Sequence, residues 1–224
     1  MDYRVISIGT LSQHELWEER GEARSGHSTT TLIECGPRRI LVDPGLPAPA
    51  IAARLAERTG LTPESITDVF LTSFRPAHRR GLPAFEHADW LIAEREREMV
   101  GSHLVEAIRE EQDEEAEAVL RREIEILQRC KVAADRPADH VDLFPLPGFT
   151  PGGCGLILSH PHSTTLIAGD AVATSEHMFA GRVLRGAYDH TAAAESFQEA
   201  IEIADTIVPG HDNVTINPAR RGMG

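Results

Sequence analysis

The sequence predicts a mixed α/β fold: a four-layer αβ/βα sandwich in which two mixed β-sheets face each other and helices cover their outer surfaces. Two stretches of the chain repeat one order of elements: a hairpin that ends at an aspartate, a helix, and a strand that leads to a histidine. A sheet that carries helices on one face must bury its other face, and the second sheet is the natural partner. The length of 224 residues suits a single domain, which we expect to cover 1–224.

The first stretch begins with a β-hairpin. Two short apolar runs rich in β-branched residues flank Gly36 and Pro37, a pattern that is typical of a hairpin turn. The predicted elements are strands at 29–35 and 39–43, a helix at 47–58 and a strand at 68–72. The hairpin ends at Asp43, and the last strand runs toward His78.

The second stretch repeats this order closer to the C-terminus. Its predicted elements are strands at 154–158 and 164–168, a helix at 191–204 and a strand at 205–208. Asp170 follows the hairpin and His211 follows the last strand. If these strand ends share one edge of the sandwich, two carboxylates and two imidazoles meet in a cleft, and such a cluster attracts a cation.

An insert at about 94–132 separates the two stretches. Its apolar residues keep helical spacing with little glycine or proline, which predicts one long helix or two shorter ones. The acidic segment 110–117 is typical of a solvated helix face. Because the insert is long for one domain, it could also form a homodimer contact or a lid over the cleft.

Composition excludes several classes of protein. Asp and Glu number 35 against 22 Lys and Arg, and the net charge of −13 repels nucleic-acid phosphates and anionic lipids. No apolar run is long enough to span a bilayer, and the N-terminus lacks the pattern of a signal peptide. We therefore expect a cytoplasmic protein with a small-molecule ligand or substrate, and neither a nucleic-acid nor a membrane partner.

The order of these motifs resembles that of the metallo-β-lactamase superfamily. The resemblance rests on the segments 41–45, 147–152, 168–170 and 208–211, and the span from the first to the last of them covers most of the chain. It implies the four-layer sandwich and one or two metal ions at the common edge of the sheets. It also implies that Asp43 is a buried aspartate that supports the ligand loops without binding the metal itself.

Several metal ligands of that family are missing here. Its His-x-His-x-Asp-His motif corresponds to residues 73–78, of which only His78 keeps a ligand. The positions that differ are Ser73, Arg75, Ala77 and, in the Pro-Gly-His-Thr-Pro-Gly element, Phe149. The resemblance implies that the first metal subsite has lost all of its histidines, whereas the second keeps His78, Asp170 and His211. Two imidazoles and a carboxylate suit one divalent ion, which would be zinc, iron or manganese. The site could also hold no metal at all.

Arg75 has two alternative roles. Its guanidinium could enter the vacated first subsite and pair with Asp170, or it could point into water. In an active enzyme Asp170 would bind the metal and orient the water, and Arg75 could stabilise a developing oxyanion. We regard Asp170 and Arg75 as the candidate catalytic residues.

Four further residues are candidates for lining the pocket. Ser73 and Phe149 stand at vacated ligand positions, and Phe149 makes its position apolar. His177 could touch a ligand or lie at the surface, and Tyr188 could reach a substrate carbonyl or pack half-buried.

The number of lost ligands favours a non-catalytic or weakly active relative that binds a small ligand or a partner. The alternative is a mononuclear metal-dependent hydrolase of esters, thioesters or lactones that uses His78, Asp170 and His211.

Overall fold

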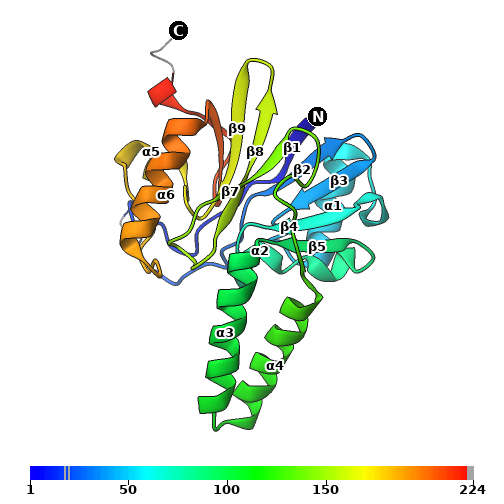
Figure 1. The fold of residues 1–224 in the computed structure, drawn as a ribbon, viewed down its shortest axis with the longest axis vertical. Helices are drawn as coiled ribbons and strands as arrows, with labels where there is room; N and C mark the ends of the chain where they lie inside the picture. Colours follow the sequence, from blue (N-terminus) through cyan, green and yellow to red (C-terminus); the bar gives the residue numbers. More distant parts are fainter. Residues whose placement is uncertain (18, 20, 221–224) are drawn as a thin grey trace.

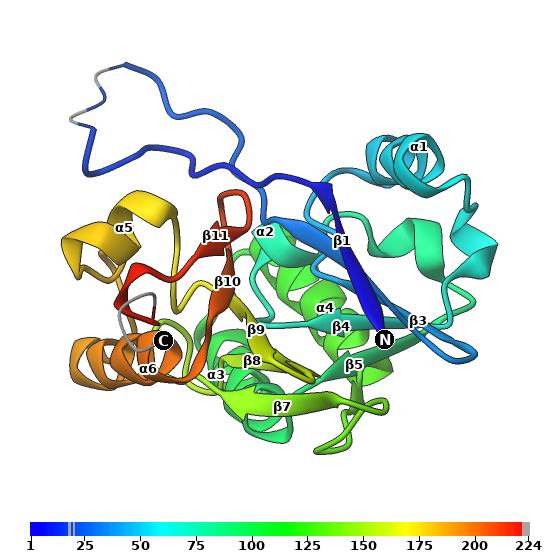
Figure 2. The same cartoon turned by 90° about the horizontal axis from the view of Figure 1, so that it is seen from above.

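Two mixed β-sheets form the centre of the computed structural model, which describes residues 1–17, 19 and 21–220 (Figure 1). The first sheet consists, in spatial order, of β1 (Asp2–Ser7), β2 (Thr30–Cys35), β3 (Arg38–Val42), β4 (Asp68–Leu71), β5 (Asp89–Ile92) and β6 (Lys131–Val132). The second consists of β11 (Thr215–Ile216), β10 (Thr206–Pro209), β9 (Ser163–Gly169), β8 (Cys154–His160) and β7 (Val141–Pro145). Figure 2 shows α1 (Ala48–Thr59) and α6 (His190–Ile203) at opposite outer sides. The predicted fold class is confirmed.

The repeat seen in the sequence is also present in the pairing of the strands. β1 to β4 and β7 to β10 follow the same plan, in which three antiparallel strands are joined by a parallel fourth. The edge strands β1 and β7 and the short parallel strand β5 were not predicted. The helix α1 begins after Pro47 and ends at Gly60, whose φ of 72° suits a residue without a side chain.

Alternating side chains divide the core into three layers. Ile40 and Val42 of β3 point between the sheets, where they belong to the same cluster as Leu156 and Leu158 of β8. Leu41 belongs to the cluster beneath α1. Beneath α6, Phe197 and Ala200 pack with Leu166 and Ile207. The sheets are therefore fixed face to face, and the loops at their strand ends start from a rigid base.

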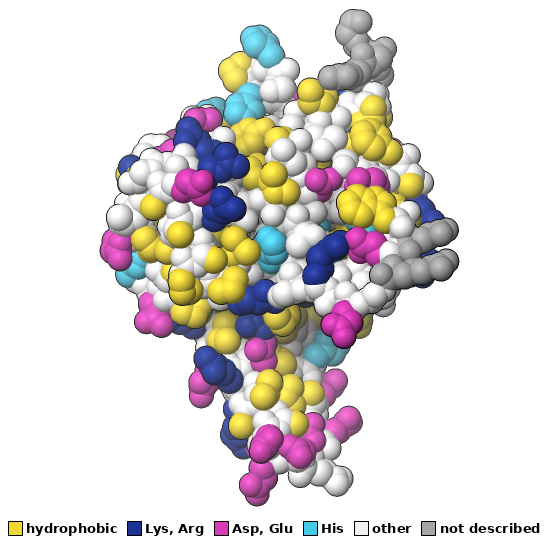
Figure 3. Space-filling view, turned by 180° about the vertical axis from the view of Figure 1, so that it is seen from behind, with side chains coloured by type: hydrophobic (Ala, Val, Ile, Leu, Met, Phe, Trp, Pro, Cys, Tyr) yellow, Lys and Arg dark blue, Asp and Glu magenta, His cyan; other side chains and the backbone are white. Residues whose placement is uncertain are grey.

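The insert folds as a helical hairpin that projects from the sandwich (Figure 1). It consists of α3 (Glu94–Glu110) and α4 (Glu114–Arg129), so two shorter helices form and not the one long helix that the sequence also allowed. Val100, Leu104 and Leu127 anchor its base in the core beneath α1. The segment 110–117 is mostly exposed, and Figure 3 shows acidic side chains crowding the far end.

A long loop, here called the 8–29 loop and described at 8–17, 19 and 21–29, joins β1 to β2 and extends toward α5 (Ser175–Ala180), as Figure 2 shows. A bridge between Thr10 and His27 closes its base. Within the described part of the chain, no helix combines the length and apolarity that crossing a membrane requires.

Candidate metal centre

Strand ends from both sheets place the candidate ligands at one edge. The parallel pairs β3–β4 and β9–β10 direct their carboxyl ends to this edge, as parallel strands must. Asp43 follows β3, Asp170 follows β9, and His211 follows β10. His78 lies in the short helix α2 (Pro76–Arg79), which follows the loop after β4.

His78, Asp170 and His211 converge on a single point. The Nε2 atom of His78 lies 3.0 Å from Oδ2 of Asp170, and Nε2 of His211 lies 2.9 Å from Oδ1 of the same carboxylate. One ligand atom from each of the three residues lies within 4.8 Å of the others. All three side chains are buried.

Asp43 holds the His78 ring from its other side. Its Oδ2 lies 2.9 Å from Nδ1 of His78 and accepts the Thr72 hydroxyl at 2.6 Å. Its Oδ1 accepts the Thr72 backbone N–H at 2.8 Å. Asp43 has a φ of 50°, a left-handed conformation that is uncommon outside glycine. These hydrogen bonds are the compensation for that backbone strain.

The hydrogen-bond partners limit where the imidazole protons can lie. Nδ1 of His211 lies 3.0 Å from the carbonyl oxygen of His27, which only accepts, so this nitrogen carries a proton. Nδ1 of His78 lies 2.9 Å from Oδ2 of Asp43 and 3.2 Å from the Thr72 hydroxyl oxygen, whose own proton goes to Asp43, so this nitrogen is protonated as well. Both Nε2 atoms therefore face Asp170 either with a second proton or with a lone pair directed at a cation.

The donor set fits a divalent ion. Two carboxylates, Asp43 and Asp170, contribute two negative charges, which either two imidazolium protons or one dication can balance. Imidazoles anchored through Nδ1, with Nε2 left to bind, are the usual arrangement of histidine ligands to metals. His78, Asp170 and His211 would hold the ion, and Asp43 would orient His78.

Charge within the cluster shifts two pKa values strongly. Burial alone would lower the pKa of His78, but the charges of Asp170 and Asp43 and their hydrogen bonds raise it to about 10. Burial alone would raise the pKa of Asp170, but the charge of His78 and hydrogen bonds from both rings hold it well below its usual value. Without an ion, His78 is therefore protonated and Asp170 is ionised at neutral pH.

Comparison with known structures shows the same architecture. A candidate metallo-β-lactamase from Thermotoga maritima is 18% identical over 96% of this chain and 98% of its own, with a TM-score of 0.66. A B. thuringiensis AiiA variant with N-decanoyl-L-homoserine bound at the active site is 19% identical over 94% of this chain and 92% of its own, with a TM-score of 0.64. The dizinc quorum-quenching lactonase AidC is 18% identical over 78% of this chain and 67% of its own, with a TM-score of 0.62.

This chain has the metallo-β-lactamase fold. No protein-family model matches the sequence, and no curated protein matches it. The identities to the solved structures are below 20% in all three cases, so the likeness defines the fold alone.

Arg75 does not occupy the first subsite that the resemblance implies for the metallo-β-lactamase fold. Its guanidinium lies 4.4 Å from the centre of the Phe149 ring, and its side chain is exposed. Asp170 is instead paired with the two histidines. The alternative in which Arg75 pairs with Asp170 is therefore wrong, because the aromatic face of Phe149 holds the guanidinium at the mouth of the site.

The space beside Asp170 where the resemblance implies a first subsite is nearly filled by protein. Ser73 and Phe149 line a cavity of only about 10 Å³ that also reaches Asp170. That volume is about the space of one water molecule. The Ser73 hydroxyl is buried there without a hydrogen-bond partner among the described residues.

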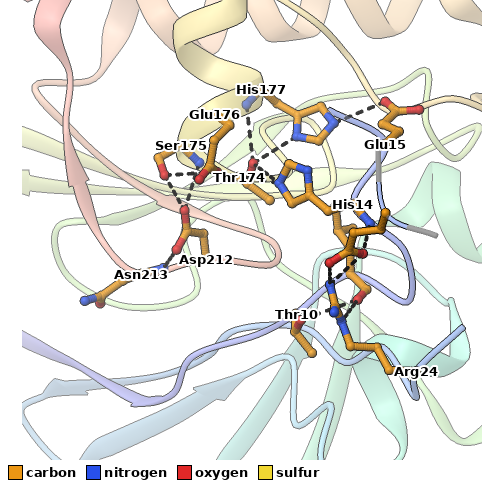
Figure 4. Close-up of polar contacts among 12 residues, drawn as sticks. Thr10, His14, Glu15, Arg24, Thr174, Ser175, Glu176, His177, Asp212 and Asn213 are labelled. Atoms are coloured by element: carbon orange, nitrogen blue, oxygen red, sulfur yellow. Dashed lines mark hydrogen bonds and ion pairs between the residues drawn. The ribbon is translucent and has the colours of Figure 1, made fainter. Parts of the chain in front are cut away.

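Two predictions about the pocket lining need correction. His177 is fully buried and does not line either cavity beside Asp170 and His211. Its Nδ1 lies 2.9 Å from the Thr174 hydroxyl and its Nε2 lies 3.1 Å from Glu15 (Figure 4). It therefore anchors the 8–29 loop to α5. Tyr188 is 60% exposed and packs against His103 of α3 instead of reaching either cavity.

Glu96, a fully buried carboxylate in the first turn of α3, was not predicted from the sequence. It accepts the backbone N–H groups of Phe74 and Gly152, each at 2.9 Å. Burial raises the pKa of Glu96, although these hydrogen bonds oppose the shift. Glu96 thus joins the two loops that flank the site. An acidic residue in an acidic helix carries no sequence signal that would separate it from its exposed neighbours.

Proposed function

We propose that this protein is a mononuclear metal-dependent hydrolase of esters, thioesters or lactones. The observation that carries the proposal is the convergence of His78, Asp170 and His211, with both rings anchored through Nδ1. Three protein ligands leave a coordination position open, which is the usual arrangement of a catalytic zinc site.

The space beside the candidate ligands supports the same proposal. A cavity of about 290 Å³ borders His211, and Arg75, Ala77 and Phe149 form part of its wall. This is close to the lower end of the volumes typical of small-molecule sites. A substrate in this cavity would lie next to the three ligands.

The chain's own residues would position the reaction. A divalent ion lowers the pKa of a water molecule that it binds and polarises the substrate carbonyl. Asp170 holds both imidazole rings in position, and Asp43 fixes the tautomer of His78. The Arg75 guanidinium, held on Phe149, offers a positive charge to the carbonyl oxygen as negative charge develops there. The reaction consumes one water, breaks the acyl bond, and yields an acid and an alcohol or thiol.

The similar structures support the reaction class but not the number of ions. AidC is a dizinc lactonase, whereas Ser73, Arg75 and Phe149 provide no imidazole for a first ion in this chain. We therefore propose one ion.

A second candidate is a metal-free binding protein, the function that the count of lost ligands favours. Two observations support it. The space implied for a first subsite is almost filled, and the buried His78 lies between two carboxylates, both of which its protonated ring can pair with in the absence of a metal. In this alternative the 290 Å³ cavity binds a ligand without turnover.

Turnover after metal loading separates the two candidates. Protein stripped with a chelator and reloaded with zinc, manganese or ferrous iron is assayed on 4-nitrophenyl butyrate, a thioester and a homoserine lactone. We expect activity that returns with metal and falls at least about a hundredfold in Asp170→Asn and His211→Ala.

The matched control is His162→Ala, because His162 is an exposed histidine in the turn between β8 and β9. We expect this variant to keep full activity. Absence of metal-dependent turnover on all three substrates in well-folded protein would reject the hydrolase and leave the metal-free binding protein.

A further inference from the structure

The cavity beside His211 is formed by two distant parts of the chain. One wall comes from the 8–29 loop and includes Leu11 and Gln13. The opposite wall includes Arg75, Phe149 and Arg185. The loop is held in place by the contact of Glu15 with His177 (Figure 4) and by a second contact of Glu15 with Arg185. Because His211 borders this space, any group bound here lies next to the candidate ligands.

The charge of this cavity is opposite to that of the whole protein. Two arginines line it, whereas Glu15 is the only acidic residue of its described lining. The protein as a whole carries a net charge of −13. Arginines placed together in a hollow of an acidic protein create a local positive potential that attracts anions.

Each of the two guanidinium groups is held by one contact and still has N–H donors free. The face of the Arg75 guanidinium stacks on Phe149 at 4.4 Å, a contact that leaves the N–H edge unused. Arg185 uses Nε to contact Glu15 at 3.1 Å, so its Nη atoms remain available. The planar N–H fork of arginine matches a carboxylate or phosphate better than lysine does.

Glu15 does not cancel this charge. Its Oε1 is occupied by Nε2 of His177 at 3.1 Å and its Oε2 by Nε of Arg185. The Glu15 carboxylate is only 17% exposed, whereas the Arg185 side chain is 80% exposed. The accessible charge in the cavity is therefore the guanidinium, with the carboxylate serving as its support.

We infer that this cavity selects substrates that carry a carboxylate, separated from the scissile carbonyl by a short hydrocarbon chain. The inference rests on the proposed function, because it takes the candidate metal site as the place of bond cleavage. Arg185 would bind the carboxylate, Arg75 would stay with the carbonyl oxygen, and Leu11 and Phe149 would contact the hydrocarbon chain. The preferred substrates would be half-esters, half-thioesters or carboxylated lactones.

Two esters of equal chain length test this selection. In 4-nitrophenyl hydrogen glutarate a terminal carboxylate replaces the methyl group of 4-nitrophenyl valerate. We expect kcat/KM for the glutarate ester to exceed that for the valerate ester by about tenfold or more after subtraction of spontaneous hydrolysis. The excess should shrink at high ionic strength, because salt screens exposed charges.

Substitution of Arg185 supplies the second readout. Arg185→Gln is expected to bring the ratio of the two kcat/KM values close to one, mainly through KM for the glutarate ester. The matched control is Arg182→Gln, which removes the same charge three residues before Arg185. The Arg182 side chain is exposed and does not line this cavity. The control should keep the wild-type ratio.

The outcomes separate this inference from the proposed function. Equal rates for both esters, or a ratio that Arg185→Gln leaves unchanged, would overturn the carboxylate selection while the hydrolase stands. If neither ester is hydrolysed, the hydrolase proposal fails, and titration of glutarate into the wild type and Arg185→Gln decides the inference by calorimetry. Binding weakened about fivefold or more by the substitution would support the anion site, and equal or undetectable binding would overturn it.

Discussion

At the scale of single residues, each histidine of the candidate site faces an acceptor through Nδ1 and the shared carboxylate of Asp170 through Nε2. The buried carboxylates require positive charge close by, because an unpaired buried charge is costly. Protons can supply this charge when no ion is bound. The ion-free and ion-bound states then share one framework and differ in which cation occupies it.

The raised pKa of His78 predicts how the stability of ion-free protein depends on pH. The unfolded ring titrates near 6.5 and the folded ring near 10. The proton therefore contributes its full stabilisation below pH 6.5, and this contribution is lost as the pH rises toward 10. We expect the free energy of unfolding of chelator-treated protein to fall between pH 7 and 10.

Urea denaturation of the wild type and His78→Gln across this pH range provides the measurement. The substitution should remove most of the decline, whereas the control His162→Ala should retain it. An equal decline in His78→Gln and the wild type would contradict the assignment of the proton to His78.

Substitution of Ala77 can add a fourth ligand to the set formed by His78, Asp170 and His211. It lies next to His78 and lines the cavity that borders His211. The Ala77→Asp variant adds an oxygen donor and a negative charge, both of which favour a divalent ion. We expect the dissociation constant for zinc to fall at least about tenfold, measured by competition with a chromophoric chelator. An unchanged or weaker affinity would show that the cation does not bind beside α2.

At the scale of elements, the sequence was most informative where local pattern decides structure. The predicted hairpins, the helices at 47–58 and 191–204 and the strands that follow them all occur within a few residues of their predicted bounds. The spacing of apolar residues that marks a strand or a helix depends only on residues close together in the sequence. The duplicated order then restricts the topology, because few arrangements bury both inner faces.

The elements that sequence analysis missed depend on distant contacts. β5 and β7 are short, and the 8–29 loop takes its position from α5 through the contacts of His14 and Glu15 (Figure 4). Similarly, the sequence identifies His78, Asp170 and His211 as candidates but does not reveal that Phe149 holds Arg75 away from Asp170. Such contacts join residues far apart in the chain, where periodicity carries no information.

Glu96 joins two of these elements, and its loss should be costly. Glu96→Ala leaves the N–H groups of Phe74 and Gly152 without their carboxylate partner in a buried position. We expect a loss of about 3 kcal/mol in the free energy of unfolding, measured by urea denaturation of metal-loaded protein. Glu98→Ala, at an exposed position of the same helix, should cost less than about 0.5 kcal/mol. Equal effects of the two substitutions would contradict the role of Glu96.

At the scale of the whole molecule, the base of the helical hairpin belongs to the core of the sandwich, whereas the far half of the hairpin lies outside it. The base of the hairpin contributes Val100, Leu104 and Leu127 to the core, whereas Val105 and Val119 are largely exposed. The many acidic side chains of segment 110–117 repel one another and do not favour burial. The two alternatives for this insert, a homodimer contact and a lid over the cleft, both stay untested.

Truncation of the hairpin tests this division. Replacing residues 107–121 by a short Gly-Ser-Gly turn retains the buried base of both helices. We expect the thermal midpoint to change by less than about 5 °C, because the exposed half buries little apolar surface. A fall of more than about 10 °C in a calorimetric scan would show that the tip supports the sandwich. Solution mass of the same two proteins tests the homodimer: a dimer that truncation converts to monomer would support it, and a monomeric full-length protein would rule it out.

Metal stoichiometry shows whether His78, Asp170 and His211 hold one ion. Ion-free protein is dialysed against zinc, manganese or ferrous iron and then analysed for bound metal by elemental analysis. We predict about one equivalent of one of these ions in the wild type and in His162→Ala, and less than about a tenth of an equivalent in His211→Ala and Asp170→Asn. Two equivalents, or a wild type that retains less than a tenth of an equivalent of every ion, would contradict the account.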